Sequence, residues 1–113
     1  MNLMRLTAVE LGKKIKSGEV KVRDAVLDAF AQMEAVEKDI NSYVTVLEKE
    51  KVLAKAEEIQ SKIDAGELDG PLAGVPVAIK DNMCTEGILT SCSSKILSNF
   101  YPTYTSQAVL NLE

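Results

Sequence analysis

The sequence reads Gly70-Pro-Leu-Ala-Gly-Val-Pro-Val-Ala-Ile-Lys80-Asp-Asn82 at its most informative point. A Gly/Pro-rich approach leads into the short apolar run Val75–Ile79, which ends at a single lysine, Lys80. An apolar run of this length between turn formers is typical of a buried β-strand. We therefore expect a buried strand over Val75–Lys80, with the amine of the lysine at its end.

The position of Lys80 has two interpretations. Removing an ammonium group from water disfavours its charged form and so lowers its pKa. A lysine held in such a place can act as a base near neutral pH. The alternative is a surface lysine at the end of a strand, whose ammonium group reaches water. The spacing of the residues taken alone favours the surface lysine.

Length and composition indicate one small globular piece. The chain has 113 residues, 46% of them apolar, which is ordinary for a globular protein. Its 17 acidic and 13 basic residues give a formal charge of −4, and no basic block stands apart from acidic residues, so no nucleic-acid surface is predicted. No apolar run approaches a membrane span, and the N-terminus lacks a signal-peptide core. We therefore predict a cytoplasmic location.

The cysteine and histidine content limits the possible chemistry. Cys84 and Cys92 are the two cysteines, and the sequence has no histidine. A structural zinc site normally takes four Cys or His ligands, and a Cys–His nucleophile pair cannot form within this chain. We expect no metal site, and we expect both cysteines to be small, half-buried side chains.

Three helices are predicted before Lys80. Thr7-Ala-Val-Glu10 has the pattern of a capping box and predicts a helix from Ala8 to about Lys16. A second helix is expected from about Val22 to Val36, which makes residues 1–40 a helical pair. Its apolar stripe consists of Val22, Ala25, Val26, Ala29, Phe30, Met33 and Val36. The third helix is expected from Glu48 to Ala65, with Val52, Leu53, Ala56, Ile59 and Ile63 on its buried face.

The fold class follows from a second predicted strand. Tyr43–Leu47 is rich in β-formers and predicts a strand. Together with the third helix and the strand Val75–Lys80, it predicts a βαβ unit over residues 43–80 with a right-handed crossover. Parallel sheets usually contain more than two strands and are covered on both faces. We therefore expect an α/β fold, a mixed sheet with flanking helices, of which this chain holds the N-terminal helices and the first βαβ unit.

The region 81–113 is predicted to be a loop and the start of a further helix. Lys95–Phe100 is expected to form a helical turn, and Thr105 or Ser106 can cap a helix that begins at Gln107. That helix is cut off soon after it begins. We therefore predict that the chain is the beginning of a larger α/β domain.

The stretch around Lys80 resembles the lysine-bearing segment of the amidase signature family. The resemblance continues through Met83–Phe100 and includes Leu6-Thr-Ala-Val-Glu-Leu11 and Tyr43-Val-Thr45. Within the family, the sequence most resembles the glutaminase subunits of the tRNA-dependent amidotransferases. It covers essentially all of residues 1–113 and implies that they form the N-terminal part of a single amidase-signature domain.

The resemblance implies a Ser–cis-Ser–Lys triad, in which Lys80 matches the lysine that serves as base and then as acid. Both serines of the triad belong to a segment that lies after the end of this chain. Asp81 and Asn82 are expected either to support the turn and the geometry of the lysine by hydrogen bonds or to be ordinary turn residues. Ser91, Ser93 and Ser94 are expected to form pocket wall rather than to replace the missing serines.

The resemblance also implies partners. The expected complex contains a B and a C subunit, and the ammonia released from glutamine amidates Glu-tRNA(Gln), which is bound through the B subunit. ATP and magnesium are implied for the whole complex, and no cofactor is expected in this chain, which alone is expected to be inactive. Two alternatives stay open: a non-catalytic module that docks other subunits, and part of an amidase that hydrolyses small free amides.

Overall fold

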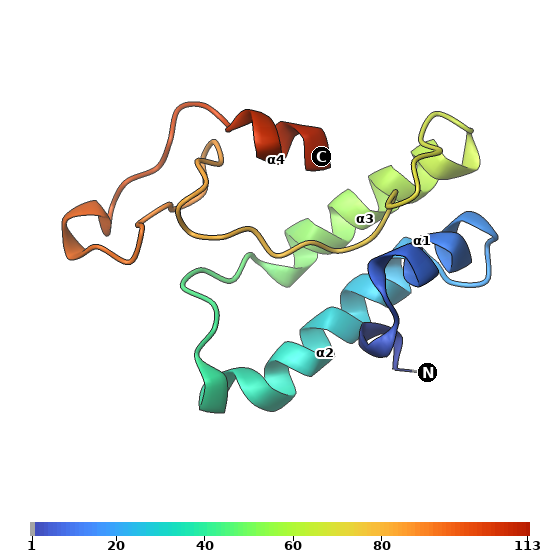
Figure 1. The fold of residues 1–113 in the computed structure, drawn as a ribbon, viewed down its shortest axis with the longest axis horizontal. Helices are drawn as coiled ribbons and strands as arrows, with labels where there is room; N and C mark the ends of the chain where they lie inside the picture. The colour runs from blue at the N-terminus through green and yellow to red at the C-terminus, as the bar shows by residue number, and fades with distance from the viewer. Residues whose placement is uncertain (1) are drawn as a thin grey trace. The chain divides into compact units, whose positions relative to one another are not determined.

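The structure, a computed structural model, describes residues 2–113. Its elements follow in the order η1 (Leu3–Arg5), α1 (Ala8–Lys16), α2 (Val22–Ile40), α3 (Lys49–Asp64), η2 (Lys95–Leu97) and α4 (Gln107–Leu112) (Figure 1). The described residues contain no β-strand. None of their helices has the length and apolar character needed to cross a membrane.

The chain divides into two compact units. The helical unit comprises the chain up to Ser42 together with Leu47–Pro76. The loop unit comprises Tyr43–Val46 and Val77–Glu113. Each unit is therefore built from two separate stretches of chain, and each is described by itself below.

The helical unit begins with the predicted capping box, which the structure confirms. The hydroxyl oxygen of Thr7 accepts from the Glu10 N–H at 3.2 Å, and the Glu10 carboxylate accepts from the Thr7 N–H at 2.8 Å. These two bonds satisfy amide groups that the first turn of a helix otherwise leaves without partners. The cap fixes the start of α1 and directs Leu11 and Ile15 into the core.

The core of the helical unit uses most of the predicted apolar stripes, but Ala29, Met33 and Val36 of the second helix are not among its members. Its buried members are Leu3, Leu11, Ile15, Val20, Val22, Ala25, Val26 and Ala56. Helices α2 and α3 lie side by side, and half-buried residues of both, among them Phe30 and Ile63, pack against this cluster (Figure 1). The structure extends α2 to Ile40, about one turn past the predicted end, because the chain leaves the helix at Asn41, which has a left-handed φ of 54°.

Two glycines allow the turn Gly70–Gly74 to lie against the helices. A Cβ atom added at Gly12 would lie 2.0 Å from the carbonyl oxygen of Pro71. Gly74 has a φ of +82°, and a Cβ there would lie 2.7 Å from Cγ2 of Val22. Only glycine fits both close approaches. They fix the path of the chain just before Val75, which packs against the core.

The predicted βαβ unit over residues 43–80 is wrong. Its helix is present as α3, but neither Tyr43–Leu47 nor Val75–Lys80 forms a strand in the described chain. A strand needs a ladder of backbone bonds to a neighbouring segment. The Val75 N–H instead donates to the Leu72 carbonyl at 3.1 Å, which closes a local turn. Without a paired neighbour the run is not buried, and Val77 is 52% exposed.

The loop unit is joined across its width by backbone bonds rather than by a regular sheet. The Ser106 N–H donates to the Cys84 carbonyl at 2.8 Å, the Gly87 N–H to Pro102 at 3.1 Å, and the Thr90 N–H to Phe100 at 3.0 Å. The two segments that these bonds join run antiparallel. The bonds are unevenly spaced along them, so no ladder forms. The predicted helical turn is present as η2, and α4 begins at Gln107 as expected.

Candidate functional site

The candidate site is a corner of the loop unit, where Lys80–Asn82 meets the turn Ser91–Ser94. The Lys80 carbonyl accepts from the Met83 N–H at 3.0 Å, and the Asp81 carbonyl accepts from the Cys92 N–H at 3.0 Å. The backbone on both sides of the Lys80–Asp81 peptide is thus tied down. The Lys80 side chain is exposed, which corrects the expected place at the end of a buried strand.

The Asp81 carboxylate is the centre of this corner. One oxygen, Oδ1, accepts from the Ser91 N–H at 3.0 Å. The other, Oδ2, accepts from the Ser91 hydroxyl at 2.5 Å and from the Ser93 N–H at 3.2 Å. These donors, with the Ser91 hydroxyl first and the positive charge of Lys80 adding a smaller effect, lower the pKa of Asp81 below its ordinary value. The group is therefore a carboxylate at neutral pH.

The turn that Asp81 binds has an unusual backbone. Cys92 and Ser93 have φ values of 51° and 56°, so two successive residues other than glycine are left-handed. Each such residue is disfavoured by about 1–2 kcal/mol. The Ser94 N–H closes the turn on the Ser91 carbonyl at 2.8 Å. Successive N–H groups in a tight turn form an anion-binding concavity, and here the anion is a side chain of the same chain.

The structure brings together some of the predicted site residues and leaves others apart. Ser91 is 5% exposed and, like Ser93, donates to Asp81, whereas Ser94 is half-buried and closes the turn. Asn82 is exposed and makes no side-chain hydrogen bond to the described residues.

The cysteines follow the prediction in part. Cys84 is half-buried as predicted, but Cys92 is exposed, at a backbone φ of 51°. Both are free thiols.

The pairing of Asp81 with Ser91 is a contact that the sequence did not predict. The two residues are ten positions apart and belong to no helical or strand period. The available signal was compositional, because Asp81 is followed, after a short loop, by a tract of small and mostly polar residues, Thr90–Ser94. Such tracts form turns whose N–H groups need acceptors.

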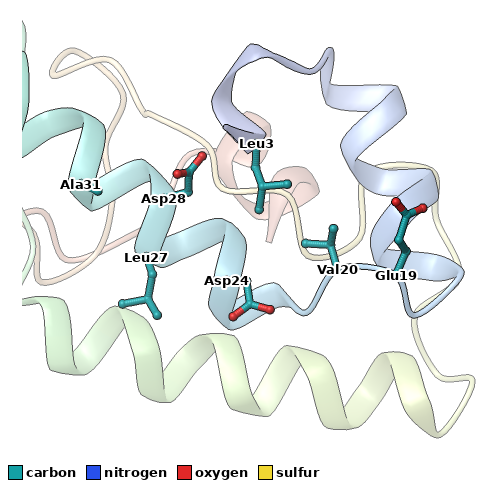
Figure 2. A pocket seen from close by; sticks show the side chains of 7 residues that line it. All are labelled: Leu3, Glu19, Val20, Asp24, Leu27, Asp28 and Ala31. Carbon is teal, nitrogen blue, oxygen red and sulfur yellow. The ribbon is translucent and has the colours of Figure 1, made fainter. Parts of the chain in front are cut away.

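The helical unit contains a pocket of its own. It has a volume of about 450 Å³ and is lined by Leu3, Glu19, Val20, Asp24, Leu27, Asp28 and Ala31 (Figure 2). Glu19 pairs with Lys14 at 2.5 Å, and Asp28 accepts from the Met4 N–H at 3.1 Å. Asp24 lies in the first turn of α2, where the helix dipole favours a negative charge. The three carboxylates thus already serve the fold.

Metal ligands do not gather in the part of the chain that the structure describes. Within residues 2–113, no group of three His, Cys, Asp or Glu side chains lies close enough to hold a metal ion. The candidate site itself offers the exposed amine of Lys80 and the hydrogen-bonded carboxylate of Asp81.

Comparison with known proteins points to one family. A sequence model of the family described as Amidase matches residues 24–113. The glutamyl-tRNA(Gln) amidotransferase A subunit of Agathobacter rectalis is 66% identical over the whole chain, and that of Lachnospira eligens is 58% identical. The chain spans 22% and 23% of the lengths of these two relatives.

A solved structure is similar as well. It is described as an unexpected vestigial protein complex that reveals the evolutionary origins of an s-triazine catabolic enzyme. Its chain matches with a TM-score of 0.84 and 31% identity, over 95% of this chain and 23% of that one.

Proposed function

We propose, given that this chain belongs to the amidase family, that it is the N-terminal part of the glutaminase subunit of a glutamyl-tRNA(Gln) amidotransferase. The observation that carries the proposal is 66% identity to such a subunit over all 113 residues. The relatives are more than four times as long, so the activity belongs to the whole protein and residues 1–113 are one part of its amidase domain. Alone, this part is expected to be inactive.

Lys80 is the residue of this chain to which we assign a catalytic role. A serine supplied by the rest of the protein attacks the amide carbon of glutamine, and its proton passes through a second serine to the Lys80 amine. The protonated lysine then returns that proton to the leaving ammonia. The match of Lys80 to the lysine of the family segment supports this role, and hydrogen bonds to the Lys80 and Asp81 carbonyls hold the backbone from which its side chain leaves.

The turn Ser91–Ser94 is assigned to the wall of the pocket around Lys80. Ser91 is buried and its hydroxyl donates to Asp81, which supports a structural place rather than that of the nucleophile. Ser93 and Ser94 take part in the same turn through their N–H groups. The nucleophile and the bridging serine are therefore assigned to the part of the protein outside these 113 residues.

The whole complex is proposed to pass the ammonia on. B and C subunits are its partners, and Glu-tRNA(Gln), bound through the B subunit, is converted to Gln-tRNA(Gln). ATP and magnesium are proposed as cofactors of the whole complex. The cytoplasmic location stays a prediction.

The test is Lys80→Ala in the full-length protein assembled with its partners. Glutaminase kcat/KM is expected to fall by about 10²–10⁴-fold, the usual contribution of a positioned acid–base group. Lys95→Ala, at another exposed lysine of the loop unit, is the matched control and is expected to leave turnover unchanged. Near-wild-type turnover of Lys80→Ala would remove the lysine from the mechanism. Turnover of small free amides without any glutamine-dependent amidation of tRNA would favour the alternative amidase.

A further inference from the structure

We propose that Asp81 is a positioning residue for Lys80, which holds the left-handed turn at Cys92 and Ser93 against the peptide that follows the lysine. The proposal rests on the proposed function of Lys80. It goes further in naming the contact that fixes the geometry of the amine. Three features of this corner support it: the donors, the backbone and the way in which the main chain around the lysine is held.

The donors converge on Asp81 from one turn. Both carboxylate oxygens are engaged by Ser91 and Ser93, through two N–H groups and one hydroxyl at 2.5–3.2 Å. The Asp81 carbonyl accepts from the N–H between these two, that of Cys92, at 3.0 Å. One residue thus accepts from three successive amides. Within the turn itself, the Ser91 carbonyl accepts from the Ser94 N–H at 2.8 Å and the Ser91 hydroxyl oxygen accepts from the Ser93 N–H at 3.2 Å.

The backbone of the turn needs such a partner. Two successive left-handed residues with side chains are together disfavoured by about 2–4 kcal/mol, and neither Cys92 nor Ser93 is a glycine. Charge-assisted hydrogen bonds are about twice as strong as neutral ones and can offset a cost of this size. We therefore infer that the turn keeps this conformation because the carboxylate holds it.

Asp81 holds Lys80 through the chain rather than through a direct role in the reaction. The carboxylate oxygens already receive three hydrogen bonds from the turn, so they are not free to accept a proton from a substrate. The Lys80 carbonyl is held by the Met83 N–H, and the next carbonyl by Cys92. The two main-chain bonds fix the direction in which the lysine side chain leaves the backbone.

The critical variant is Asp81→Asn in the full-length protein with its partner subunits. An amide side chain keeps one acceptor oxygen but replaces the other with an NH₂ group, which would face the N–H or hydroxyl donors of the turn. We expect glutaminase kcat to fall by about 10–100-fold, as for a small misplacement of a catalytic group, with KM nearly unchanged. Glu86→Gln, at an exposed carboxylate of the same unit, is the matched control and is expected to leave kcat unchanged.

Two further measurements distinguish positioning from a general loss of structure. Hydrogen exchange at the amides of Ser91, Cys92 and Ser93 is expected to become faster in Asp81→Asn, while exchange in α2 stays the same. Adding Cys92→Gly and Ser93→Gly to Asp81→Asn is expected to restore part of kcat, because glycine adopts a positive φ without the cost. A merely structural lesion would not be rescued by more flexible residues.

The outcomes separate this inference from the proposed function. The positioning role would be overturned if Asp81→Asn kept the wild-type kcat. It would also be overturned if kcat fell together with a rise in KM and the two glycine substitutions did not restore it. In both cases Lys80 would stay catalytic. The proposed function would be overturned if the wild-type protein showed slow hydrogen exchange at the amides of the turn but no glutaminase turnover. The positioning role would then be overturned as well. Should Asp81→Asn fail to fold, Ser91→Ala keeps the carboxylate and removes the hydroxyl, which donates to Asp81 and accepts from the Ser93 N–H at 3.2 Å. It is expected to lower kcat less than Asp81→Asn does, and an unchanged kcat would overturn the inference.

Discussion

The helical unit and the loop unit keep their shapes by different means. In the helical unit, apolar side chains from η1, α1, α2 and α3 form one buried cluster. Among the described residues of the loop unit, the buried apolar side chains are those of Pro102 and Val109. The buried polar residues of the described chain, Thr90 and Ser91, also lie in this unit. Its segments are joined by hydrogen bonds between positions 10–22 residues apart.

The two units are therefore vulnerable to different changes. A cluster of apolar side chains is weakened by truncation and by overpacking, because its stability depends on filled volume. A loop joined by polar contacts is weakened by loss of an acceptor or by protonation, because an unpaired buried donor is costly. The four predictions below test this contrast in order of decreasing effect.

Ile15→Ala is expected to have the largest effect. Ile15 is 1% exposed at the centre of the cluster, so its truncation leaves a cavity and should reduce the free energy of unfolding of the helical unit by about 3 kcal/mol. Native-state hydrogen exchange of the α1 and α2 amides measures this loss. Val9→Ala, at an exposed position of α1, is the control, with an expected change of about 0.5 kcal/mol or less. Equal losses in the two variants would contradict a volume-dependent core.

Gly12→Ala should come next, because the new methyl group would lie 2.0 Å from a backbone carbonyl that cannot rotate away. Overpacking of this kind is expected to destabilise the helical unit by about 2 kcal/mol, against the usual gain when alanine replaces glycine in a helix. Denaturant titration followed by circular dichroism reports it. Gly70→Ala meets open space and serves as the control. A stabilised Gly12→Ala protein would show that the turn does not lie on α1.

A pair of helix caps gives the third comparison. Thr7→Ala removes the oxygen that caps α1, with an expected cost of about 1 kcal/mol. Ser106 stands at the same position of α4, but its buried hydroxyl has no hydrogen-bond partner, so Ser106→Ala should cost nothing and can stabilise the loop unit slightly. Thermal melting of both variants tests the contrast. A larger loss for Ser106→Ala than for Thr7→Ala would reverse the assignment of the caps.

The smallest effect expected is the response to acid. Because the pKa of Asp81 is lowered by the donors of the turn, the folded carboxylate binds a proton more weakly than the unfolded one. Its stabilisation is complete above the ordinary carboxyl pKa of about 4 and is lost as the pH falls through the lowered value.

Hydrogen exchange measured between about pH 5 and pH 2 should therefore show the Ser91–Ser93 amides losing protection in acid, and Asp81→Asn should abolish this pH dependence. Glu10 provides the comparison in the helical unit. Its pKa is lowered by the N–H and hydroxyl of Thr7, so acid should reduce protection in the first turn of α1. Protection at the turn that is independent of pH would show that Asp81 does not hold it.

The helices were predictable because each is encoded by neighbouring residues. The capping box of Thr7 and Glu10 and the apolar period of α2 and α3 lie within single stretches of sequence. The predicted strands failed for the opposite reason. An apolar run such as Val75–Ile79 is compatible with a strand, but whether it becomes one depends on a neighbouring segment, and no described residue supplies it.

The sequence named residues for the candidate site, whose roles stay predictions, but it did not indicate the contacts among them. The resemblance identified Lys80, Asp81 and the serines of the turn from their order in the sequence. The bonds of Asp81 to Ser91 and Ser93 could not be inferred, because they depend on two left-handed residues that are not glycines. A sequence pattern that relies on glycine to mark positive φ overlooks a turn whose conformation is held by a distant acceptor.

The interleaving of the two units has a consequence for synthesis on the ribosome. Tyr43–Val46 belongs to the loop unit, whose remaining residues begin at Val77 and emerge about 30 residues later. At about 5–20 residues per second, this β-prone segment waits about 1.5–6 s for its companions. The stretch that emerges during the wait is α3, whose lysines and glutamates follow the segment directly. Charged residues that flank a β-prone segment discourage it from pairing with another chain, so we expect the charges of α3 to limit such pairing until the loop unit is complete.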